Sequence, residues 1–154
     1  MAAGKDSHAE GFSTLASGDY SHAEGEFAFA QGLGSHAEGG GHAQGKGSHA
    51  ESLGQAFGNL SHAEGYGSTH AEAAHAEGSG QAEGSHSHAE GENTRTVGAN
   101  SHAEGNNTVA YGDNQHVQGM YNIVDYDNKY AHIVGNGYHN NRRNIHTLDW
   151  QGNA

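Results

Sequence analysis

The chain contains no cysteine and no proline, and it is poor in positive charge. Without cysteine, neither disulfide bonds nor cysteine-based zinc sites can form. Lysine and arginine together number 6, against 18 aspartate and glutamate residues, so the formal net charge is −12 with histidine neutral. Binding to a phosphate backbone depends on clustered cations, so we expect no nucleic-acid partner.

Long apolar runs are also missing, since hydrophobic residues make up only 32% of the chain and are scattered. No stretch approaches the roughly 20 apolar residues that a membrane-spanning helix requires. The first residues run directly into polar sequence without the apolar segment of a secretory signal. We therefore expect no membrane insertion and no export signal, and composition alone would be compatible with disorder.

Glycine, alanine and histidine are abundant and are arranged in an internal repeat. The word SHAEG begins at Ser7 and returns at positions 21, 35, 61, 87 and 101. Between these words lie more variable ones, such as TLASG, AFAQG and GHAQG. The central alanines follow one another at seven-residue steps near both ends of the repeat and at five- to eight-residue steps in its middle. The full period is therefore two words, or 13–14 residues.

A seven-residue period can indicate a coiled coil, but heptads need large apolar residues at two positions and contain few glycines. Glycine at the end of each short word instead favours a strand followed by a turn. Side chains alternate in extended backbone. Ser7, Ala9 and Gly11 are therefore expected on the inner face, and His8 and Glu10 on the outer face.

The sequence therefore predicts an all-β fold, a parallel β-roll (β-solenoid) of 13–14-residue coils over residues 1–119. A small C-terminal β cap is expected over residues 120–154, where glycine becomes rarer and larger apolar residues appear. Stacked coils align equivalent residues, which predicts two structural ladders on the outer face. The histidine ladder comprises His8, His22, His36, His49, His62, His75, His88 and His102. The glutamate ladder comprises Glu10, Glu24, Glu38, Glu51, Glu64, Glu77, Glu90 and Glu104.

The thin interior also predicts association. Alanine, serine and glycine bury little apolar surface, so a single roll has little to offset the entropy lost on folding. A face that has the same residues in every coil can pack against the same face of another copy and so bury additional surface. We expect the face that carries the two ladders to contact other copies of this chain.

Over residues 7–119, the alternation of SHAEG with words such as TLASG and AFAQG resembles the head repeats of trimeric autotransporter adhesins of the YadA type. This resemblance implies a homotrimer of left-handed parallel β-rolls. In those heads the outward pair of the regular strand is commonly apolar and faces the trimer axis, whereas histidine and glutamate stand there in this chain. The five-residue motif SHAEG itself more closely resembles repeats in tail fibres and appendages of phages that infect Gram-positive bacteria. The segments KYAHIVGNG (129–137) and RRNIHTLDWQGNA (142–154) resemble the region directly after the repeats in those phage proteins.

The resemblance implies a structural and adhesive fibre module, part of a phage tail fibre or appendage on the virion. Such a module acts as a rigid spacer and can present a surface to a host-cell glycan or protein receptor. The alternative is the head domain of a bacterial trimeric adhesin at the bacterial cell surface. An enzyme built on a β-solenoid, such as a hexapeptide acyltransferase, needs a six-residue period that is not found here. We expect no enzyme, no catalytic residue and no cofactor.

The many histidines raise the question of a metal site. The word HAE does not match the HExxH motif of metalloproteases. Stacked imidazoles and carboxylates could hold a transition metal, and His86-Ser87-His88 resembles the iron-binding triplet of some trimeric phage fibre tips. We favour structural hydrogen bonding between histidine and glutamate and assign no metal site, with metal binding as the alternative. Arg142 and Arg143 could bind an anion, but we expect them to lie in a solvated surface turn.

Pairing of the two ladders has a predicted electrostatic consequence. A histidine that gains a carboxylate partner should have a raised pKa, and the glutamate a lowered one. Stability is then expected to be greatest in mildly acid solution, between the two titrations.

Overall fold

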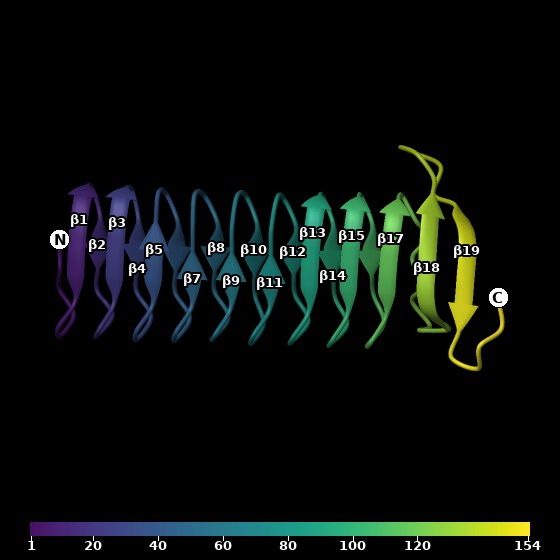
Figure 1. Cartoon of the computed structure of the whole chain (residues 1–154), viewed down its shortest axis with the longest axis horizontal. Coiled ribbons are helices and arrows are strands. Elements are labelled where there is room, and N and C mark those ends of the chain that lie inside the picture. Colours follow the sequence, from purple (N-terminus) through teal and green to yellow (C-terminus); the bar gives the residue numbers. More distant parts are fainter.

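A computed structural model describes all 154 residues. The chain forms strands and turns without any helix, and it winds into an elongated parallel β-solenoid (Figure 1). This confirms the predicted all-β class and the stacked-coil architecture. No helix long and apolar enough to cross a membrane is present.

Two sheets run along the solenoid, one for each strand of the coil. The first, which carries the SHAEG-type words, consists of β1 (His8–Phe12), β3 (His22–Glu26), β5 (His36–Glu38), β7 (His49–Ala50), β9 (His62–Ala63), β11 (His75–Ala76), β13 (His88–Glu92), β15 (His102–Asn106), β17 (His116–Met120), β18 (Tyr130–Asn136) and β19 (Asn144–Asp149). The second consists of β2 (Leu15–Ala16), β4 (Phe29–Ala30), β6 (His42–Ala43), β8 (Gln55–Ala56), β10 (Ser68–Thr69), β12 (Gln81–Ala82), β14 (Arg95–Thr96) and β16 (Val109–Ala110).

The coils stack in parallel and in register. His8 pairs with His22 fourteen residues later, and His36 pairs with His49 thirteen residues later. Because the turns absorb the difference in coil length, each histidine of the first sheet lies opposite a histidine in the next coil. The variation in the period therefore leaves the strands aligned.

The interior is built from small residues, and its hydrophobic part is almost wholly alanine. All the buried hydrophobic residues are alanines except Val117 and Ile133 near the C-terminal end. The serine that opens SHAEG closes a turn, and it is buried in every repeat except the first, where Ser7 is half-buried. Ser21 Oγ, for example, donates a hydrogen bond of 2.6 Å to the carbonyl oxygen of Gly18. Small side chains therefore let the two sheets approach, and the buried serine hydroxyls of these repeats each bond to a backbone carbonyl three residues earlier.

The alternation of side chains predicts Gly11 on the inner face, and this prediction is wrong. Gly11 is exposed, has a φ of 105°, and pairs in register with Gly25, which is also exposed. A Cβ atom on Gly11 would collide with the backbone carbonyl of Gly25. The strand therefore leaves the simple alternation after Glu10, at a backbone conformation that favours glycine.

The first sheet continues past residue 119. β17 spans that position, and β18 pairs with it in parallel, so that His132 lies opposite His116 and Ile133 opposite Val117. β19 then pairs antiparallel with β18. The change in composition near residue 120 therefore does not interrupt the sheet.

Candidate functional site

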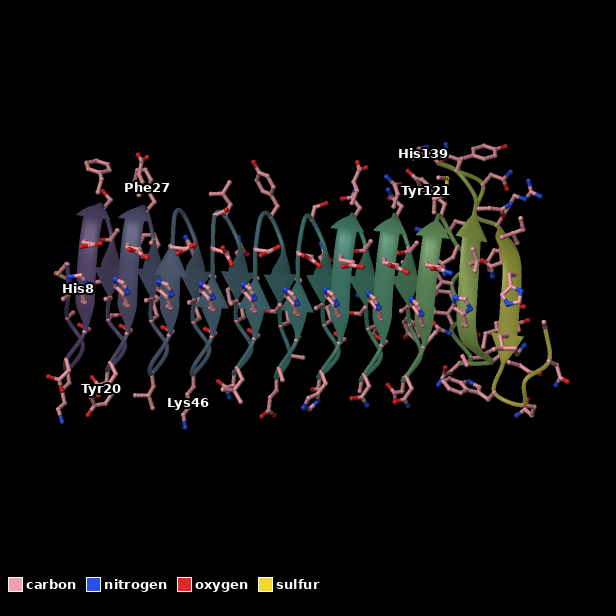
Figure 2. The ribbon with its side chains drawn as sticks, viewed as in Figure 1. His8, Tyr20, Phe27, Lys46, Tyr121 and His139 are labelled. Atoms are coloured by element: carbon pink, nitrogen blue, oxygen red, sulfur yellow. The ribbon has the colours of Figure 1, made fainter.

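The two ladders lie on the outer face of the first sheet. Figure 2 shows a row of imidazole rings that begins at His8 and crosses the strands at one height, with a parallel row of carboxylates beside it. The ladders follow from the register, because residues at equivalent positions of successive coils are direct neighbours. All sixteen predicted residues lie in the coils of this sheet.

The imidazole rings form a continuous stack. From His22 to His116, consecutive ring centroids are 4.5–4.9 Å apart and the ring planes are within 2–9° of parallel. At the two ends the rings tilt, with interplanar angles of 36° between His8 and His22 and between His116 and His132. The spacing is that of parallel strands, so the backbone sets the stack.

Histidine and glutamate pair across coils. His62 Nε2 lies 2.9 Å from Oε1 of Glu51 in the preceding coil, and His88 Nε2 lies 3.1 Å from Glu77 Oε1. His116 makes the same contact with Glu104 at 3.3 Å. The hydrogen-bonded pairs therefore connect one coil to the next, whereas the contacts within one strand are longer, at 3.9 Å for His8 and Glu10 and 3.8 Å for His88 and Glu90.

Several imidazole nitrogens are shielded from solvent without a hydrogen bond. They are the Nε2 atoms of His22, His36, His49, His75, His102 and His132. The side chains that carry them are partly open, with exposed fractions of 36% for His36 and 35% for His102. Shielded polar atoms without partners are rare in folded proteins, so this row needs an explanation.

At three of the predicted ladder histidines the pKa shifts in the direction opposite to the expected one. Burial lowers the pKa of His49, His75 and His102, and the neighbouring imidazoles of the stack lower it further. Nearby glutamates act in the other direction but have a smaller effect. Within one chain, the stack therefore favours neutral histidine, because a proton on one ring repels a proton on the next.

The expected lowering of a glutamate pKa is found at Glu51. The hydrogen bond from His62 is the main cause of the lowered pKa of the Glu51 carboxyl group.

Two ladder members were missed by the sequence analysis, His116 and His132. Their repeats have the sequences HVQG and HIVG, so they do not match the motif HAE. The signal for His116 was available, because Val117 continues the seven-residue series of central residues. His132 lies 16 residues after His116, outside the 13–14-residue period, and gives no such signal.

The other predicted candidates are not brought together. His86 is exposed in a turn with a φ of 58°, while His88 lies in the ladder, so the His-x-His pattern does not form a paired site. Arg142 Nη1 donates hydrogen bonds to the carbonyl oxygens of Asn107 (3.1 Å) and Asn122 (3.0 Å). Arg142 therefore joins the C-terminal segment to the solenoid.

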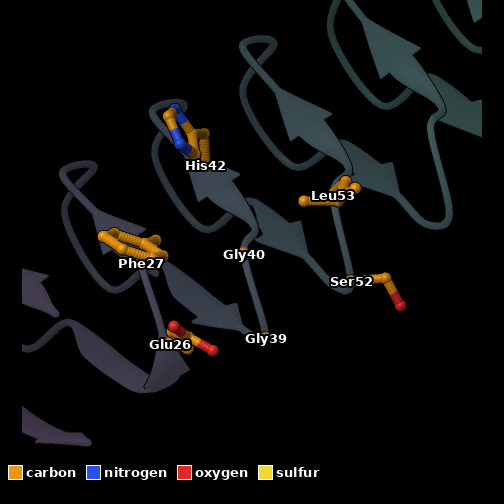
Figure 3. A pocket seen from close by; sticks show the side chains of 7 residues that line it. All are labelled: Glu26, Phe27, Gly39, Gly40, His42, Ser52 and Leu53. Atoms are coloured by element: carbon orange, nitrogen blue, oxygen red, sulfur yellow. The ribbon is translucent and has the colours of Figure 1, made fainter. Parts of the chain in front are cut away.

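A groove opens at the edge of the solenoid near the middle of the N-terminal half. Figure 3 shows Phe27 and Leu53 on either side of the bare backbone at Gly40, with Glu26 and His42 nearby. The groove has a volume of about 520 Å³, and the side chains of Phe27 and Leu53 are about half exposed. It is an accessible surface with both apolar and polar groups.

Comparison with known proteins gives no assignment, because no protein-family model matches the chain and no curated protein matches it.

Proposed function

We propose that the chain is a rigid structural module of a fibre, in which three copies of a left-handed β-roll associate through their ladder faces. The observation that carries the proposal is the alanine interior, which leaves each copy with little buried apolar surface. A homotrimer supplies further burial. The ladder face is suited to this contact because it repeats in every coil, whereas the opposite face varies.

The proposed setting is a phage tail fibre or appendage, in which the solenoid is a spacer and residues 120–154 cap its end. The variable face and the groove between Phe27 and Leu53 are then free to contact a host-cell glycan or protein receptor. The alternative is the head domain of a bacterial trimeric adhesin. Virion genes beside the parent gene would support the first setting, and an encoded membrane anchor would support the second.

Cysteine cross-linking tests which face meets another copy, because the natural chain contains no cysteine. We expect Glu64→Cys, on the ladder face, to form a disulfide between chains under mild oxidation. Gln55→Cys, exposed on the opposite sheet, is the matched control and should stay monomeric on a non-reducing gel. Cross-linking of the control alone, or of neither variant, would contradict the proposed interface.

A further inference from the structure

Three-residue groups of possible metal ligands recur along the ladders. Each group joins a histidine, the glutamate two residues later and the histidine of the following coil, and its ligand atoms all lie within 4.8 Å of one another. The groups are His22–Glu24–His36, His36–Glu38–His49, His49–Glu51–His62 and His88–Glu90–His102.

The donor set selects a class of metal. Two imidazole nitrogens and one carboxylate oxygen suit zinc and similar divalent transition metals, often with a further position left for water. Magnesium and calcium prefer oxygen ligands, so they fit these groups poorly. The groups also include four of the shielded nitrogens that have no hydrogen bond, those of His22, His36, His49 and His102. A bound cation would give each of these nitrogens a partner.

We infer that the ladders bind divalent transition-metal ions of the zinc class, each held by two histidines of consecutive coils and the glutamate between them. This inference goes beyond the structural role that the sequence favours for the ladders. Each group is complete within one chain, so the inference does not depend on how many copies assemble.

The groups cannot all be filled at once. The first three overlap, because His36 and His49 each belong to two groups. A neutral imidazole offers one lone pair for coordination, so a shared histidine can serve only one ion. The first three groups therefore hold at most two ions, and the separate fourth group adds one, for three ions per chain.

Binding requires only side-chain movement. The stacked rings must turn toward each other to place the nitrogens and the oxygen about 2.0–2.2 Å from the ion. In three groups a nitrogen and a carboxylate oxygen already lie close. The distances are 3.5 Å for His36 and Glu24, 2.9 Å for His62 and Glu51, and 3.5 Å for His102 and Glu90. The partial exposure of these side chains leaves room for rotation.

The number of zinc ions per chain tests the inference. The full chain is refolded from denaturant with excess zinc, so that assembly does not block access, and is then dialysed and analysed for metal. We expect three ions per chain. Glu51→Gln removes the third group and leaves the first and second, which share His36 and so hold one ion between them; the count should fall to two. Glu90→Gln removes the fourth group and should also give two.

Glu38→Gln is the matched control. It removes only the middle group, and the two groups on either side share no residue, so the count should stay at three. His42→Gln and His70→Gln on the second sheet should also leave it at three, and magnesium should not be retained. A parent count other than three, equal counts in Glu38→Gln and Glu51→Gln, or a loss in His42→Gln would overturn the inference. Light scattering on the same samples reports assembly separately.

Discussion

At the residue scale, the surroundings of a stacked imidazole ring set the direction of its pKa shift. His75 lies between His62 and His88, whose rings are 4.8 and 4.5 Å away, and it is near the carboxylates of Glu64 and Glu77. Burial and the two neighbouring rings lower its pKa and outweigh the two glutamates. A protonated ladder is therefore costly, in contrast to an isolated histidine that is paired with a carboxylate.

This shift predicts instability in acid. A lowered folded-state pKa gives stability that is present above the ordinary histidine value of 6.5 and is lost as the pH falls toward the folded value. Glu51 adds a loss at lower pH, since its pKa lies below the ordinary value of 4.5. We expect the melting temperature to be highest above about pH 7 and to fall steadily on acidification.

The measurement is melting temperature against pH, with a chelator present to remove metal. His75→Gln should make the decline below pH 6.5 shallower, because one histidine with a lowered pKa is gone. His42→Gln, on the second sheet, should leave the profile unchanged. A stability maximum between pH 4.5 and 6.5 would show that pairing with glutamate dominates instead.

At the scale of the element, each strand relies on the coil beside it, and the last coil needs a substitute. Asn122 is fully buried at the end of the second sheet. Its Oδ1 accepts a hydrogen bond of 2.8 Å from the Val109 amide, and its Nδ2 donates one of 3.0 Å to the Val109 carbonyl. The side-chain amide therefore takes the place of the next strand beside β16.

Removing this amide should destabilise the solenoid. We expect Asn122→Ala to lower the free energy of unfolding by about 2 kcal/mol, because it leaves a buried amide and carbonyl without partners. Asn136→Ala is the control, since Asn136 is exposed at the end of β18 and is not among the residues with a positive φ. Equal effects of the two changes in chemical denaturation would mean that Asn122 does not protect the edge.

The coil also predicts which deletions are tolerated. Deleting residues 21–34 removes one complete coil, and β5 can then stack on β1 with histidine opposite histidine. Deleting residues 21–27 should destabilise the fold strongly, because it places Phe29 and Ala30 where His22 and Ala23 belong. Melting followed by circular dichroism compares them, and equal stability would show that the two-strand coil is not the structural unit.

Much of this element-level structure could be predicted from the sequence. The repeated word specifies the strand, the alternation of Ala23 with His22 and Glu24 specifies its faces, and the period specifies the partner strand. The position of Gly11 could not be predicted, because its positive φ breaks the alternation. The lowered pKa of His75 also required the structure, since it depends on burial and on the spacing of the neighbouring rings.

At the scale of the whole molecule, the solenoid is a thin rod with one uniform face and one variable face. The buried hydrophobic side chains are nearly all methyl groups of alanine, so extending the rod adds little apolar burial for each coil. In the proposed account, assembly supplies what the single chain lacks, and the ladder face is where it occurs. The same account leaves the variable face and the edge groove exposed for recognition.

The molar mass in solution tests this central claim most directly. Light scattering coupled to size-exclusion chromatography should give three times the chain mass of 16.0 kDa, or 48 kDa, over a range of concentrations. The same sample should show β-type circular dichroism and a cooperative melt. A monodisperse species of 16.0 kDa with such a melt would contradict the account, because it would show that the alanine interior stabilises a single copy.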